Sequence, residues 1–225
     1  MAAPPVGRAM QAAGGPSRRL VLGLAAVLPL TALLSFGQAP APAAPPEPLF
    51  VDPPGPLPES LRPRLEAARA ALAGGQRTVG DVLREPSSNE LRPYTEFREL
   101  IREHAREVAV RLAPSDEPGE PLLVRLRVVD GEQRARAGVL VYAYQTSAKG
   151  WYAAAAPHVG GNEGDHKHAR LFGYCRTGPD GWVELATIRP GGYPRSTLPQ
   201  HIHVALTGEP GRPAGAKCCS TTTRA

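Results

Sequence analysis

Hydrophobic residues recur at helical spacing in two stretches of the first half of the chain. The first stretch, residues 59–75, ends in two glycines and places four apolar residues every three or four positions: Leu61, Leu65, Ala68 and Leu72. The second stripe runs from Tyr94 to Leu112 and includes His104, for which we expect a packed, hydrogen-bonded role. The pattern predicts two short helices within residues 59–113.

From Pro121 onward the hydrophobic period changes to two. In "PLLVRLRVVDG" the leucines and valines alternate with arginines, as in a half-buried strand. Turn sequences such as "TGPDG" and "RPGGYP" separate further strand-like segments at 137–145, 169–177, 181–188 and 201–207. We therefore predict a mainly β protein, an antiparallel β-sandwich core preceded by two short helices.

Composition agrees with a turn-rich protein and excludes several functions. The 225 residues include 26 prolines and 24 glycines, which disfavours a helical bundle. The net charge is +5, but residues 1–37 hold three arginines and no acid, so the remainder carries 23 basic against 21 acidic residues. This balance, without a basic stripe, argues against nucleic-acid binding. The three cysteines, Cys175, Cys218 and Cys219, form neither a disulfide framework nor a Cys-x-x-Cys zinc site.

The N-terminus has the layout of an export signal. "PSRRLVLGLAAVLPLTALLSFGQAPAPA" has an arginine pair, an apolar run and then small residues, and "SRRLVLG" resembles a twin-arginine signal. We expect a signal over residues 1–44, a proline-rich linker over 45–58 and an exported protein with no stable membrane association after cleavage. An ordinary secretory signal and an uncleaved anchor are the alternatives.

Candidate chemistry is concentrated in "GGYPRSTLPQHIHVAL". Alternate residues of a strand project from one face, so His201 and His203 form half of a metal site. Tyr193 precedes them in a turn, and Tyr152 follows a strand and a glycine. Phenolate ligands require a strongly Lewis-acidic ion, and hard anionic oxygens favour Fe(III) over Zn(II) or Cu(I). Surface histidines and packing tyrosines are the alternative interpretation.

Three stretches carry a family resemblance, in this order: "AGVLVYAYQTSAKGWYA", "LFGYCRTGPDGWVELATIRPGGYP" and "PQHIHV". Together they resemble the core of the intradiol ring-cleavage dioxygenases, the relatives of catechol 1,2- and protocatechuate 3,4-dioxygenases. The resemblance covers roughly a third of the chain, from Gly138 to Leu206, and makes residues 121–208 the expected β-sandwich metal-binding catalytic core.

The resemblance implies a non-haem Fe(III) held by Tyr152, Tyr193, His201 and His203. It also implies a catechol-type aromatic diol and O2 as substrates, ring cleavage between the hydroxylated carbons, and a muconate-type diacid as product. One tyrosine leaves the iron when substrate binds, and Tyr152 and Tyr193 are both candidates for that catalytic role. In relatives the N-terminal helices serve dimerisation, which allows a homodimer through residues 59–113.

Three features depart from the family pattern. Leu198 stands where catechol-cleaving relatives have an arginine, so we consider Arg195 as a substitute substrate-binding residue and do not expect catechol itself to be the substrate. Gln200 replaces the usual alanine. We expect residues 209–225 to be an irregular tail, because they lack the strand period of the segment that closes the sandwich in relatives. A truncated or frame-shifted C-terminus is one explanation of that difference.

Two other functions fit parts of the pattern. An exported copper- or zinc-binding protein would use a second pair, His166 and His168, together with His201 and His203. His158 and Asp165 lie close in sequence to this second pair and could join it in another metal site. The simpler interpretation is that these histidines lie in a loop on the surface. A non-catalytic, transthyretin-like binding module would need the glycine and turn pattern only as a scaffold.

Overall fold

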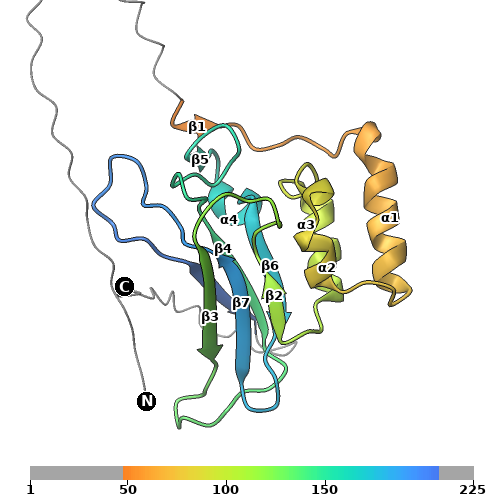
Figure 1. Cartoon of the computed structure of the whole chain (residues 1–225), viewed down its shortest axis with the longest axis vertical. Coiled ribbons are helices and arrows are strands. Elements are labelled where there is room, and N and C mark those ends of the chain that lie inside the picture. The colour runs from red at the N-terminus through yellow and green to blue at the C-terminus, as the bar shows by residue number, and fades with distance from the viewer. Residues whose placement is uncertain (1–47, 208–225) are drawn as a thin grey trace, which may run out of the picture. The chain divides into compact units, whose positions relative to one another are not determined.

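The structure is a computed structural model that describes residues 48–207 (Figure 1). The expected signal over residues 1–44, Cys218 and Cys219, and the tail over 209–225 lie outside the described residues. Of the expected linker, Phe50–Val51 forms strand β1, which pairs in parallel with β5 (His158–Val159). Between residues 48 and 207, no helix is both long and apolar enough to cross a membrane.

The helical layer contains three α-helices, which lie together beside the sheets in Figure 1. Helix α1 (Arg62–Ala73) confirms the first predicted helix, and a single 3-10 turn (Glu59–Leu61) precedes it. Helix α2 (Val79–Arg84) was not predicted. Thr78 and Asp81 form a capping box that satisfies exposed amide groups at its first turn. A second 3-10 turn (Pro86–Ser88) leads towards α3 (Thr95–His104).

The predicted second helix is too long at its C-terminal end. Helix α3 ends at His104, and Ala105 adopts an extended conformation. Residues Ala109–Arg111 form strand β2, because Val110 and Leu112 there alternate into the space between the sheets, next to Gly173. Over so short an apolar run, hydrophobic periodicity does not distinguish a helix from a strand. His104 is half-buried, and its Nδ1 bonds the carbonyl of Leu100 at 3.0 Å, as expected.

Two three-stranded sheets form the mainly β core. One has the order β2-β7-β3, from β3 (Pro121–Arg127) and β7 (Trp182–Ile188), with β2 parallel to β7. The other has the order β6-β4-β8, all antiparallel, from β4 (Leu140–Gln145), β6 (Leu171–Arg176) and β8 (His203–Thr207). All the predicted strands are therefore present. A Cβ on Gly173 of β6 would lie 2.8 Å from Leu112, so the layers meet closely there.

A buried arginine ties the helical layer to the sheet that carries the site. Arg98 of α3 donates to the carbonyl of Ala169 at 2.8 Å and hydrogen-bonds the hydroxyl of Tyr142. Its guanidinium lies 3.8 Å from the centroid of the Phe172 ring. These contacts fix the chain before β6, including the short helix α4 (Gly164–His168), against β4.

Candidate metal centre

Two loops that are distant in sequence bring Tyr152 and Tyr193 together. The loop after β4 contains Gly150, and the loop after β7 contains Gly191 and Gly192. A Cβ on Gly150 would lie 2.0 Å from the carbonyl oxygen of Gly192, and one on Gly191 would lie 2.4 Å from the carbonyl oxygen of Ala148. Gly150 and Gly191, each two residues before a tyrosine, are therefore required because the two backbones touch.

Hydrogen bonds hold these loops in register. Thr146 Oγ1 donates to the carbonyl of Gly191 at 2.8 Å, and the amide of Gly191 donates to the carbonyl of Ser147 at 2.8 Å. Behind them, the buried Gln145 donates to the carbonyl of Ile188 and accepts from Thr187 Oγ1. The two tyrosines are thus supported by satisfied polar groups on both loops.

Four donor atoms converge at one point. The hydroxyls of Tyr152 and Tyr193 are 2.5 Å apart. Tyr193 Oη also lies 2.8 Å from His201 Nε2 and 3.1 Å from His203 Nε2, and the two Nε2 atoms are 3.0 Å apart. All four residues singled out from the sequence meet here.

The neighbouring backbone fixes which nitrogen of His201 faces this point. His201 Nδ1 lies 2.7 Å from the carbonyl of Pro199, which can only accept, so Nδ1 carries the proton. In the neutral ring Nε2 therefore presents a lone pair to the other three donors. Burial, and then the adjacent His201, lower the pKa of His203 to about 4, so the His203 ring is neutral near pH 7.

The phenols fit a cation of high charge. Tyr152 is only 2% exposed, and its burial, followed by its hydrogen bond with Tyr193, raises its pKa far above the ordinary value. Only a strong positive charge at the convergence point would hold it as phenolate. The hydroxyl oxygen of Tyr193 has three close neighbours, Tyr152 Oη and the Nε2 atoms of both histidines, but only one proton to share with them. The lone pairs of these four atoms therefore repel one another, whereas a cation at the centre would attract them all. The donor set therefore fits a metal ion.

Aromatic rings support the imidazoles. Tyr144 of β4 is paired with His203 in the sheet, and the two rings stack at 4.5 Å with 7° between their planes. Tyr144 also contacts the ring of Tyr152 at 5.9 Å. We did not single out Tyr144 from the sequence, although its alternation with Tyr142 was a signal that both rings share one sheet face.

The second histidine pair does not join this centre. Within α4, His166 packs edge-on against Tyr144 at 5.5 Å, and His168 Nδ1 bonds the carbonyl of Pro93 at 2.8 Å. His158 Nδ1 instead bonds Asp165 Oδ2 at 2.8 Å. In the described part of the chain, no three His, Cys, Asp or Glu side chains are grouped to hold a metal. The four-histidine arrangement expected for a copper or zinc carrier is therefore not formed.

Residues around the loop before β8 lie towards solvent. Arg195 is exposed with a left-handed φ of 62°, and Leu198 is 58% exposed. Gln200 accepts from Arg189 Nε at 3.0 Å, which ties this side chain to the strand end at β7. The suggestion that Arg195 replaces the family arginine stays a prediction.

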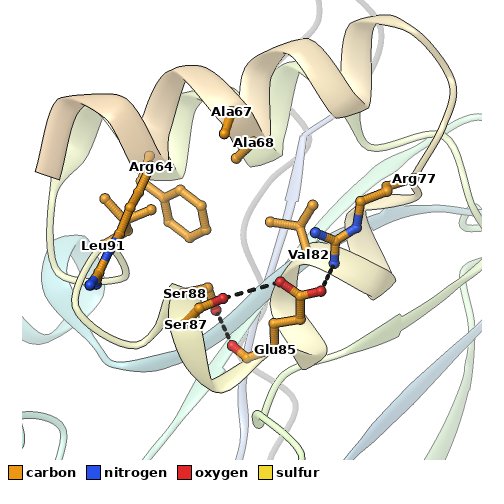
Figure 2. Close-up of a pocket in the computed structure, with 10 residues that line it drawn as sticks. Arg64, Ala67, Ala68, Arg77, Val82, Glu85, Ser87, Ser88 and Leu91 are labelled. Carbon is orange, nitrogen blue, oxygen red and sulfur yellow. Dashed lines mark hydrogen bonds and ion pairs between the residues drawn. The ribbon is translucent and has the colours of Figure 1, made fainter.

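A separate cavity of about 210 Å³ lies between α1 and the segment 82–91, in the helical layer. Figure 2 shows Arg77 and Glu85 pointing towards each other across it, at 2.6 Å, with Ser87 donating to the same carboxylate at 3.1 Å. Arg64, on the other side, pairs with Glu90 at 3.2 Å. Both cations of this cavity already have acidic partners, so it does not compete with the tyrosine–histidine centre as a reactive site.

Comparison with protein families decides the relationship. A family model described as "Dioxygenase" matches residues 95–217, more than half of the chain. The chain belongs to the dioxygenase family. This match includes all four converging residues and confirms the resemblance to intradiol ring-cleavage dioxygenases.

Solved structures of dioxygenases are also similar to this chain. The dioxygenase domain of a dioxygenase–carbohydrate-binding fusion from Streptomyces sp. SirexAA-E is 32% identical, over 48% of this chain and 60% of that chain, with a TM-score of 0.37. An intradiol ring-cleavage dioxygenase from Tetranychus urticae is 25% identical, over 44% and 50%, with a TM-score of 0.37. The 3-chlorocatechol 1,2-dioxygenase from Rhodococcus opacus is 18% identical, over 67% and 68%, with a TM-score of 0.36.

The chain spans only 50–60% of the length of the first two structures. No curated protein matches the chain.

Proposed function

We propose that this chain is a non-haem Fe(III) dioxygenase that cleaves the ring of a catechol-type aromatic diol. The observation that carries the proposal is the convergence of two phenol oxygens and two imidazole nitrogens, with the contacts between them at 2.5–3.1 Å. Two hard anionic oxygens with two imidazoles favour a trivalent iron over Zn(II) or Cu(I), as the chemistry of ligand hardness requires. Tyr152, Tyr193, His201 and His203 would hold the ion.

Bound there, Fe(III) would supply a Lewis acid and a template for the diol and O2, for a ring cleavage between the two hydroxylated carbons that gives a muconate-type diacid. The chain's own contribution is positioning. The carbonyl of Pro199 holds His201 in the tautomer that presents Nε2, and Tyr144 stacks on His203 to fix its plane. The loop contact at Gly150 and Gly191 sets the separation of the phenols.

The structure supports different roles for the two tyrosines. Tyr152 is 2% exposed and lies against Tyr144, so displacing it would open the core. Tyr193 is partly exposed and lies in a Pro/Gly turn whose next residues are solvent-facing. We therefore assign to Tyr193 the role of the phenol that moves away when a diol binds and accepts a proton from a diol hydroxyl, while Tyr152 stays in place.

Metal analysis and a visible spectrum of the purified chain test the proposal. We expect iron and a tyrosinate-to-iron absorption band that shifts when catechol is added without oxygen. Tyr152→Phe should remove most of the iron, because a buried ligand oxygen is lost, whereas Tyr193→Phe should retain part of it. A colourless protein that loads Cu(II) or Zn(II) would replace the proposal by the carrier hypothesis. Export by the twin-arginine route and a homodimer through residues 59–113 stay predictions from the sequence.

A further inference from the structure

Strands β1 and β5 form a two-stranded ribbon with two different faces beside the metal centre. Phe50 is paired with His158, and Val51 with Val159. Because successive side chains of a strand alternate, Phe50 and His158 share one face and the two valines share the other. The valines line a separate cavity of about 550 Å³. The ring of His158 instead contacts the rings of Tyr193 and Tyr152, with centroids 5.3 and 6.0 Å apart.

His158 is held in one orientation. Asp165 Oδ2 lies 2.8 Å from His158 Nδ1, while Asp165 Oδ1 accepts the amide of Val159 at 2.8 Å. The backbone of His158 donates to the carbonyl of Leu49 at 3.1 Å, which fastens β5 to β1. A ring fixed by its side chain and its backbone is a rigid platform for whatever packs on it.

Phe50 lies on this platform and contributes little to the core. Its ring is 5.4 Å from the ring of His158, with 31° between the planes, and the residue is 60% exposed. A row of three contacting rings thus leads from the candidate metal centre towards solvent: Tyr193, then His158, then Phe50. An exposed aromatic ring joined to a reactive centre by continuous ring contacts is placed to recognise part of a ligand.

We propose that Phe50 is a specificity-determining residue that packs against an apolar or aromatic substituent of the diol. The inference rests on the proposed function, in which the diol oxygens occupy the four-donor centre. The rings of Tyr193 and His158 separate Phe50 from that centre, so an unsubstituted catechol does not extend to Phe50. We expect a diol that bears a second ring to reach it. The substrate class is therefore an aryl- or alkyl-substituted catechol, not catechol itself.

Binding of two diols to the iron-loaded full chain tests this role. Catechol and 4-phenylcatechol are titrated without oxygen, and the shift of the visible band gives each dissociation constant. In Phe50→Ala we expect 4-phenylcatechol to bind about three- to tenfold more weakly, the loss of one aromatic contact, while catechol is unchanged. Phe50→Tyr, which keeps the ring, should retain the wild-type preference. Leu123→Ala is the matched control, because Leu123 is 58% exposed on β3 of the other sheet.

The outcomes separate this inference from the function on which it rests. Iron content and the unliganded spectrum should be the same in all four proteins, since Phe50 and Leu123 lie outside the donor set. If the wild type binds both diols and Phe50→Ala leaves the ratio of their affinities unchanged, the specificity role is wrong and the proposed function stands. If iron-loaded wild type binds neither diol, both are wrong.

Discussion

The chain contains His-x-His twice, and the two pairs have different fates. His203 is the first residue of β8 and His201 lies two residues before it; in this pair, which we call the β8 pair, the ring centroids are 4.6 Å apart and the Nε2 atoms 3.0 Å apart. His166 and His168 lie in the helical turn α4, where residues two apart do not face each other. His166 points to the tyrosines of β4 and His168 to a carbonyl before α3. The same three-letter pattern therefore brings its two rings together at the start of a strand and separates them within a helical turn.

The largest effect should come from removing a ring of the β8 pair. His203→Ala deletes a proposed iron ligand. Loss of a residue that only supports a ligand weakens metal binding about 10- to 100-fold, and we expect at least that loss here. His168→Ala removes only a hydrogen bond to Pro93 and should keep its iron. Iron-to-protein ratios and the visible band measure both variants. Equal loss of iron in the two would contradict the distinction between the pairs.

The contact between the two tyrosine-bearing loops beside the β8 pair can be broken with a single methyl group. Gly191→Ala would place a Cβ 2.4 Å from backbone atoms of Ala148 and Gly150, and nothing lies within 4 Å of a Cβ on Gly192. We expect Gly191→Ala to lower the free energy of unfolding by about 2–3 kcal/mol and to reduce iron binding as the tyrosines separate. Gly192→Ala should change stability by less than about 0.5 kcal/mol. Urea unfolding of the two neighbours gives the answer, and similar values would show that the loops can move apart freely.

The smallest effect concerns the helical pair and its response to pH. Burial, with the positive charges of Arg98 and Lys167, lowers the pKa of His166 against the opposing effect of Glu163. Its buried Nδ1 has no hydrogen-bond partner among the described residues. Because the unfolded chain binds this proton more readily, the free energy of unfolding falls as the pH drops below about 6.5.

Replacing His166 by Phe should remove that contribution. The stability lost by the wild type between pH 7 and pH 5 should exceed the loss in His166→Phe, with an upper limit of about 1.4 kcal/mol for each unit of pKa shift. Urea unfolding midpoints of both proteins at the two pH values measure the difference. Identical pH slopes would mean that His166 is not held in its neutral form by burial.

Sequence reasoning located the strands better than the helices. Alternation from Pro121 located β3, because one face of that strand is half-buried and the other is exposed, although the predicted stretch continues past the observed end at Arg127. The predicted second helix extended beyond His104, because Val108 and Val110 fit the period of a helix as well as that of a strand. Nothing in the sequence pointed to Phe50, since its strand has two residues and exists only through pairing with β5.

By itself, the sequence determined the mainly β core, the four converging residues and the family to which they belong. Strand periodicity is a local property that a short stretch of sequence already carries, and the ordered motifs contain all four residues. Only the tertiary structure decided that Gly150 and Gly191 touch, that the carbonyl of Pro199 sets the tautomer of His201, and that His166 and His168 diverge. Each of these depends on the packing of segments that are distant in sequence or on local backbone geometry, which residue spacing does not encode.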